Sequence, residues 1–96
     1  MPMKFAWDET KNSINRLKHQ ISFETAQLVF DDPFHISRQD RIENGEQRWQ
    51  TIGLAHGVVL LLVVHTYTEA DGQETIRIVS ARKAGSLERK IYAEGH

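Results

Sequence analysis

Apolar residues in the first third of the chain recur at helical spacing. Ile14, Leu17 and Ile21 fall three and four positions apart, as on the buried stripe of an amphipathic helix. Asp8 is a suitable N-cap, so the pattern predicts a helix from there to His19. The same helix would carry a polar face formed by Lys11, Asn15, Lys18 and His19.

A second, shorter helix is predicted directly after the first. Ser22 is its expected N-cap, and Phe23, Ala26 and Phe30 make its apolar stripe. Residues 31–33 are Asp-Asp-Pro and should end this helix, because the residue before a proline is pushed out of the α region.

The remainder of the chain has mainly the pattern of β-strands. Three strand-like runs cover residues 46–55, 58–67 and 75–82. Turn signals precede or separate them, at Asn44-Gly45, His56-Gly57 and Asp71-Gly72. Residues 3–7 could form a short strand or an anchoring segment, and residues 34–37 a short edge strand. A last short helix should begin at Ser86.

Helices followed by strands are typical of the α+β class. We therefore expect a single domain over residues 1–96. It should consist of two N-terminal helices, an antiparallel sheet of three to four strands and a short C-terminal helix.

The turn signals also predict which residues are neighbours in the sheet. With a two-residue loop at 56–57, Arg48 lies opposite His65, and Glu46 lies opposite Tyr67. Residues that pair directly in antiparallel strands have side chains on the same face, about 5 Å apart. These four side chains should therefore form a polar cluster on one face.

The second hairpin extends that face. With a two-residue loop at 71–72, His65 lies opposite Ile78, and Val63 lies opposite Ser80. One face of the sheet would then carry Glu46, Arg48, His65, Tyr67, Ser80 and Arg82. The other face, with Trp49, Leu60, Leu62, Val64, Val79 and Ala81, would be the core.

The cation that completes the polar face depends on the length of the second loop. A shift of one residue moves every side chain of a strand to the other face. With an odd loop, Arg77 and Lys83 would join His65 in place of Ser80 and Arg82. Both Arg77 and Arg82 therefore remain candidates.

Such a set of side chains suits the cleavage of RNA without a metal. Glu46 or His65 could take the proton of a ribose 2′-hydroxyl that attacks the adjacent phosphorus. His65, Tyr67 or a lysine could protonate the leaving oxygen. Arginines match the geometry of phosphate and would stabilise the charge that builds on its oxygens.

The amount and distribution of charge indicate how the chain could bind nucleic acid. The net charge of -1 argues against a purely electrostatic nucleic-acid binder. Basic residues nevertheless gather in segments 11–19 and 77–90, on either side of an acidic segment 24–46. If the basic segments fold together they form a local positive surface; the alternative is scattered, solvated charge. On this basis the polar face of the first helix could either cradle RNA or be simply solvated.

The composition of the chain restricts the metal sites it can form and the cellular location we expect. The chain has no cysteine, which excludes disulfides and thiolate metal sites, and no pair of histidines has metal-ligand spacing. We therefore expect no metal and no other cofactor. The longest apolar run, residues 58–64, is too short to span a bilayer, and no basic-then-apolar leader opens the chain. We expect a soluble cytoplasmic protein with no membrane partner.

Two blocks of sequence resemble the BrnT family of toxins. The first is Phe5-Ala6-Trp7-Asp8-Glu9-Thr10-Lys11-Asn12, continued by Leu17-Lys18-His19 and by residues 21–33. The second is Ile76-Arg77-Ile78-Val79-Ser80-Ala81-Arg82-Lys83-Ala84, preceded by Glu46-Gln47-Arg48 and Val63-Val64-His65-Thr66. Together they have the family's order and spacing, and they cover nearly the whole chain.

The resemblance implies a RelE-like fold and the toxin of a bacterial type II toxin–antitoxin system that arrests growth by cutting RNA. It also implies neutralisation by a BrnA-type antitoxin. That antitoxin would contribute a ribbon–helix–helix element, so operator DNA would be bound only by the complex. The expected catalytic residues are Glu46, Arg48, His65, Arg77 and Arg82. The expected RNA-binding residues are Lys11, Lys18, His19, Tyr67 and Lys83.

One position departs from the family pattern. Members often carry a basic residue two positions after the His-Thr pair, where this chain has Thr68. The chain could then be a weaker nuclease, or it could recruit Arg77 or Arg82 instead. It could also be a toxin homologue without catalysis that binds the antitoxin in autoregulation, or an RNA-binding fold that does not cut.

Overall fold

The structure is a computed structural model that describes residues 3–95. Along the chain lie β1 (Lys4–Ala6), α1 (Glu9–His19), α2 (Phe23–Ala26), the 3₁₀ helix η1 (Gln27–Asp31), β2 (Ile36–Glu43), β3 (Glu46–Ala55), β4 (Val59–Ala70), β5 (Gln73–Lys83) and α3 (Ser86–Glu94). Within this described part, none of the helices is long and apolar enough to cross a membrane.

The strands form one mixed sheet in the order β1-β5-β4-β3-β2. β1 runs parallel to β5, with Phe5 opposite Ile76, and the other neighbours are antiparallel. The expected antiparallel sheet of three to four strands is therefore wrong: the sheet has five strands over residues 3–95, and one of them precedes the helices. β1 covers the backbone edge of β5, and β2 forms the opposite edge with charged side chains, which protect such an edge from further pairing.

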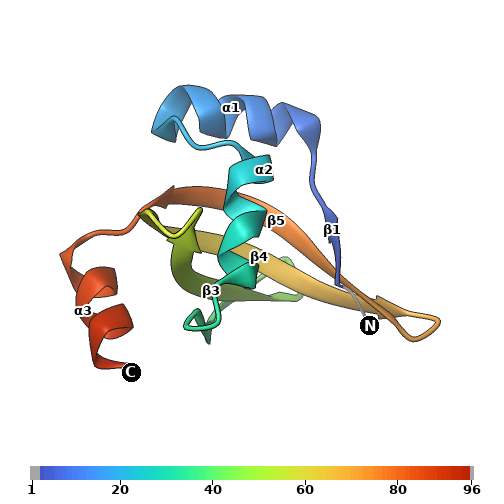
Figure 1. The fold of residues 1–96 in the computed structure, drawn as a ribbon. Helices are drawn as coiled ribbons and strands as arrows, with labels where there is room; N and C mark the ends of the chain where they lie inside the picture. Colours follow the sequence, from blue (N-terminus) through green and yellow to red (C-terminus); the bar gives the residue numbers. More distant parts are fainter. Residues whose placement is uncertain (1–2, 96) are drawn as a thin grey trace.

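Helices pack against both faces of this sheet (Figure 1). α1, α2 and η1 lie on one face, where Phe23, Ala26 and Val29 are fully buried against Leu61 and Val63 of β4. α3 packs on the other face, where Ile91 and Tyr92 meet a second apolar cluster of Ile52, Leu60, Leu62 and Ala84. Because β4 contributes to both clusters, its residues are apolar in both directions.

The first hairpin differs from its predicted register by one residue. Trp49, not Arg48, pairs with His65, and Ala55 pairs with Val59. The loop therefore holds three residues, because Val58 joins His56 and Gly57. The expected pairing of Arg48 with His65 is wrong, and the two side chains lie on opposite faces.

A β-bulge in β5 corrects the prediction for the second hairpin. His65 pairs with Ile78 as predicted, but Val63 pairs with Ala81 and not with Ser80. The register shifts between Val64 and His65, where β5 contains one extra residue. Its consequence is that Arg77 and Arg82 lie on the same face of the sheet, although they are an odd number of residues apart.

α1 has the predicted limits but packs by a different face. Asp8 caps it, with its side chain accepting hydrogen bonds from the N–H groups of Thr10 and Lys11. The expected buried stripe is wrong, since Ile14 and Leu17 are 56% and 87% exposed. The buried residues are two asparagines, Asn12 and Asn15.

Hydrogen bonds explain this inversion. The Asn15 amide donates to the carbonyls of Ala81 and Ile21 at 2.8 and 2.9 Å, and its oxygen accepts from the Ala81 N–H at 3.2 Å. The Asn12 oxygen accepts from the N–H of Phe23 at 2.8 Å. β1 ends its pairing with β5 at Arg77, so Asn15 takes over as the hydrogen-bonding partner of the β5 backbone further along.

Candidate active site

Arginines gather on the face of the sheet that α3 partly covers. We call this surface the arginine face and define it by Arg38 of β2, Arg48 of β3, and Arg77 and Arg82 of β5. The pairing of β4 with β5 fixes the positions of two members: Thr66 lies opposite Arg77, and Leu62 lies opposite Arg82. α3 packs over the apolar end of this face, so the polar end is where a ligand could bind.

Two rows of side chains cross the polar end. In one row Arg38 pairs with Gln50, Gln50 with Val64, and Val64 with Ser80. In the next row Thr66 pairs with Arg77. The pairing of β3 with β4 ends at Trp49 and His65, and Arg48 is the next residue of β3, so it shares the face of Thr66 on the adjacent strand, on the side away from Arg77.

Carboxylates hold three of the four arginines in place. Arg77 Nη2 is 2.6 Å from Glu46 Oε1, and Arg48 Nη2 is 3.3 Å from Glu43 Oε2. Arg82 Nη1 donates to Glu88 Oε1 of α3 at 2.9 Å. That hydrogen bond, with a second one from the N–H of Gly85, holds the pKa of Glu88 below its ordinary 4.5. The face thus presents oriented guanidinium groups, the geometry that binds phosphate.

His65 lies on the other face, away from the arginines. It is 0% exposed, its Nε2 is 2.7 Å from Thr51 Oγ1, and its ring packs edge-on against Phe30 and Tyr67, each at 5.0 Å. Burial lowers the pKa of His65 to about 4. The imidazole is therefore neutral at physiological pH and is enclosed by core residues.

Tyr67 shares the face of His65. Its ring is half-buried and meets Trp49 edge-on at 5.4 Å. Burial raises its pKa above the ordinary 10.0, although a hydrogen bond with Ser37 opposes the shift. Like His65, it is separated from the arginines by the sheet.

The predicted RNA-binding residues of the first helix lie at the edge of β5. Lys11, Lys18 and His19 line a hollow of about 190 Å³ beside α1. Ser80, which belongs to the same row as Arg38, Gln50 and Val64, lines the same hollow. Lys83 is exposed at the end of β5 and pairs with Leu61. Its side chain therefore projects on the face that α1, α2 and η1 cover, opposite to the arginine face.

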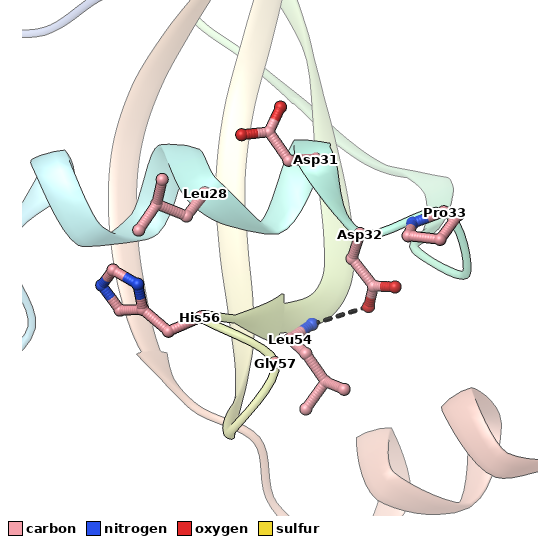
Figure 2. A pocket seen from close by; sticks show the side chains of 7 residues that line it. All are labelled: Leu28, Asp31, Asp32, Pro33, Leu54, His56 and Gly57. Carbon is pink, nitrogen blue, oxygen red and sulfur yellow. Dashed lines mark hydrogen bonds between the residues drawn. The ribbon is translucent and has the colours of Figure 1, made fainter.

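A second hollow, of about 300 Å³, lies between η1 and the β3–β4 hairpin (Figure 2). One of its two carboxylates, that of Asp32, accepts hydrogen bonds from the N–H of Leu54 at 2.8 Å and from the hydroxyl of Tyr92 at 2.6 Å. Burial alone would raise the pKa of Asp32, but these hydrogen bonds outweigh it and lower the pKa. Asp32 therefore ties α3 to the sheet. The hollow is lined by Leu28, Asp31, Asp32, Pro33, Leu54, His56 and Gly57.

The structure thus gathers Glu46, Arg48, Arg77 and Arg82 on one face and separates His65 from them. Sequence reasoning missed Arg38, Glu43, Thr66 and Glu88, which belong to the same surface. Arg38 and Glu43 were hidden because β2 contains a register shift between Gln39 and Ile42, so that segment does not alternate. Glu88 had one available signal, its place in the first turn of the last helix, where a glutamate can accept from the N–H of the N-cap residue, as it does from Gly85 at 2.7 Å.

Comparisons with known proteins identify relatives of the whole chain. The family model described as the ribonuclease toxin BrnT of type II toxin–antitoxin systems matches residues 7–88. Among solved structures, the Brucella abortus ribonuclease toxin BrnT superposes with a TM-score of 0.60, at 21% identity, over 88% of this chain and 100% of that one. At that identity the likeness supports the fold alone. No curated protein sequence matches the chain.

The family match spans most of the chain and, apart from Phe5 and Ala6, covers both sequence blocks that suggested it. It confirms the resemblance and implies an antitoxin partner. The chain belongs to the BrnT family of ribonuclease toxins of type II toxin–antitoxin systems.

Proposed function

We propose that this chain is a metal-independent endoribonuclease that cuts RNA at the arginine face. The observation that carries the proposal is the convergence of Glu46 and Arg48 of β3 with Arg77 of β5 on one face, where Arg77 reaches Glu46 across β4. Two arginines flank the position of a phosphate there, and a carboxylate lies beside them. This arrangement supplies charge stabilisation and a base without a metal.

Glu46 is the proposed general base. Its side chain is 42% exposed, and the hydrogen bond to Arg77 fixes one of its oxygens. It accepts the proton of the ribose 2′-hydroxyl, the 2′-oxygen bonds to phosphorus, and the bond from phosphorus to the 5′-oxygen breaks. The products are a 2′,3′-cyclic phosphate and a 5′-hydroxyl. Arg48 and Arg77 stabilise the negative charge of the transition state.

The leaving 5′-oxygen takes its proton from water in this scheme. His65 and Tyr67 lie on the other face of the sheet, so neither is within reach of a phosphate on the arginine face. We assign His65 to the core and Tyr67 to the support of the sheet. The proposed catalytic set therefore omits His65, and the proposed RNA-binding set omits Tyr67.

RNA outside the cut follows a basic path around the edge of β5. Ser80 connects the arginine face with the hollow that Lys11, Lys18 and His19 line. Arg82 lies between this path and α3, and Lys83 lies at its far end. Phosphates on either side of the cut would contact these side chains.

The biological role follows from the family. We infer that expression of the free protein in the bacterial cytoplasm arrests growth and that a BrnA-type ribbon–helix–helix antitoxin neutralises it. Operator DNA would then be bound by the complex through the antitoxin.

One observation favours a second function. Thr68 pairs with Thr75 two residues beyond Thr66, so it lies on the arginine face in the position where family members often carry a cation. A chain that lacks this cation could be a weak nuclease whose main role is to bind the antitoxin in transcriptional autoregulation.

Cleavage of RNA by variant proteins separates the two functions. We expect Arg77→Ala and Glu46→Gln each to lower the cleavage rate by about 100-fold or more, since both remove groups that act in the transition state. Arg89→Ala is the matched control, because Arg89 is an exposed arginine that belongs to α3 and not to the strands that carry the arginine face. The readout is cleavage of a defined RNA by purified protein, with growth after induction as a second measure.

The outcomes are distinct. If wild-type protein leaves RNA intact and growth continues, the nuclease proposal is wrong. If its complex with the antitoxin then binds operator DNA, the autoregulatory function replaces it.

A further inference from the structure

Two buried polar atoms on the arginine face have no hydrogen-bond partner. They are Thr66 Oγ1 and Arg48 Nε. Thr66 is 1% exposed, and the Arg48 side chain is 13% exposed. Buried hydroxyl and guanidinium N–H groups are nearly always hydrogen-bonded in folded proteins, so each such atom requires an explanation.

A threonine on the other face of the sheet shows the usual situation. Thr51 is also fully buried, but its Oγ1 is 2.7 Å from His65 Nε2 and 2.6 Å from Ser37 Oγ. Valine would fill the position of Thr66 with the same volume and no polar atom. The hydroxyl of Thr66 is therefore not accounted for by packing.

The two residues lie on the same face of adjacent strands. Thr66 pairs with Arg77 of β5, and Arg48 is the residue of β3 next to Trp49, where the pairing of β3 with β4 ends at His65. The ion pairs of the two arginines use Nη2 in each case, with Glu43 as the partner of Arg48 and Glu46 as the partner of Arg77. Arg48 Nε and the Thr66 hydroxyl are thus donors that these ion pairs leave without a partner.

We propose that Arg48, Thr66 and Arg77 form a subsite for one tetrahedral phosphate group. Thr66 Oγ1 and Arg48 Nε donate to its oxygens, and both guanidinium groups balance its charge. Because Thr66 is covered in the structure, the phosphate enters as the flanking arginine side chains move, and it replaces Glu43 as the partner of Arg48. That the phosphate belongs to RNA rests on the nuclease function proposed above; free inorganic phosphate offers the same chemistry.

Ion-pair geometry is consistent with such an exchange. The Arg48–Glu43 contact is 3.3 Å, and the Glu43 side chain is 41% exposed. The exposed carboxylate of Glu43 can therefore turn to water when a phosphate takes its place beside Arg48. The Arg77–Glu46 contact is shorter, at 2.6 Å, and is expected to persist and hold the base beside the phosphate.

Titration of the whole protein with inorganic phosphate tests the subsite. We expect the NMR signals of the Arg48 Nε–H and of the Thr66 methyl group to shift saturably, with a dissociation constant in the millimolar range. Thr66→Val should weaken this binding at least fivefold and should leave the thermal stability equal or higher, because it removes an unpaired buried hydroxyl. Thr66→Ser keeps the hydroxyl and should bind as wild type does.

Thr68→Val is the matched control. Thr68 lies on the same strand and the same face, one row beyond Thr66, and it is exposed. Its hydroxyl is outside the subsite, so the affinity for phosphate should not change. Unchanged phosphate binding by Thr66→Val, or no shift at Arg48 in the wild type, would overturn the subsite.

A second experiment uses RNA in place of inorganic phosphate. A dinucleotide with a 2′-deoxy sugar at the scissile position cannot be cut and should compete with phosphate for the same signals. Wild type that binds phosphate but does not cut RNA would contradict the nuclease proposal and leave the subsite standing. If the wild type cuts RNA and Thr66→Val cuts it at the same rate, the proposed subsite is wrong and the nuclease proposal stands.

Discussion

His65 combines a titratable ring with full burial. Its Nε2 is bonded to Thr51, its Nδ1 has no partner, and Phe30 and Tyr67 pack around the ring. Desolvation disfavours the imidazolium in such a site, and a positive charge on the nearby His35 would disfavour it further. The residue that the sequence pattern selects as a catalytic base is thus a neutral part of the core.

This placement predicts a loss of stability at mildly acidic pH. The pKa of His65 is about 4 in the folded protein, against an ordinary value of 6.5 in the unfolded chain, so the unfolded chain binds more protons between these two values. The contribution to stability is complete above pH 6.5 and is lost as the pH falls from 6.5 to 4. We expect a loss of about 3 kcal/mol in the free energy of unfolding by pH 4.

Urea denaturation between pH 7 and pH 5 isolates this effect. Glu24, Asp32 and Glu88 also have lowered pKa values, but their stabilising contributions are lost only near and below ordinary carboxyl values of 4.5 and 3.8. His65→Gln keeps a polar partner for Thr51 and should flatten the dependence over that interval. A wild-type profile that is already flat there would show that His65 is not buried as described.

At the scale of elements, α1 is held by polar contacts, while its apolar residues face outward. Asn15→Ala would leave the N–H and carbonyl of Ala81 and the carbonyl of Ile21 without their partner. We expect it to lower the free energy of unfolding by about 2–4 kcal/mol, because buried backbone groups lose their hydrogen bonds. Leu17→Ala is the control on the same helix and should change the stability by less than about 0.5 kcal/mol. Equal effects of the two variants in urea unfolding would contradict the inverted packing of α1.

Element limits were largely predictable from sequence, and the relations between elements were not. The strand over 46–55 and the cap at Asp8 follow from local patterns. The burial of Asn15 depends on Ala81, which lies 66 residues away, so no local pattern contains it. Val58 in the first loop and the bulge in β5 each shift the register by one residue, and together they decide which side chains share a face.

The candidate site shows the same division. Glu46, Arg48, Arg77 and Arg82 were selected from residue chemistry and from the family blocks, and the structure places them on one face. The sequence left Arg77 and Arg82 as alternatives because an unbulged strand admits only one of them. The bulge lets both contribute, a result that residue spacing could not predict.

At the scale of the whole molecule, a net charge of -1 coexists with a local arrangement of arginines. Distant acidic residues contribute little at physiological ionic strength, because charges are screened beyond about 8 Å. Binding of RNA should therefore respond to the cations it contacts, and not to the net charge. The slope of the affinity against salt concentration, both on logarithmic scales, gives the number of these contacts.

Binding of an uncleavable single-stranded oligonucleotide at several KCl concentrations provides the measurement. Contacts from Arg48, Arg77 and Arg82 predict a slope of log K against log salt of about -2, since each neutralised phosphate of a single strand contributes about -0.7. If RNA also follows the path beside α1, Lys11 and Lys18 steepen the slope to about -3.5. Arg77→Ala should reduce the slope by about 0.7, and Lys18→Ala should do the same only if that path is used. Fluorescence anisotropy provides the binding constants, with Arg89→Ala as the control that keeps the wild-type slope. An unchanged slope in Arg77→Ala would place the RNA somewhere other than the arginine face.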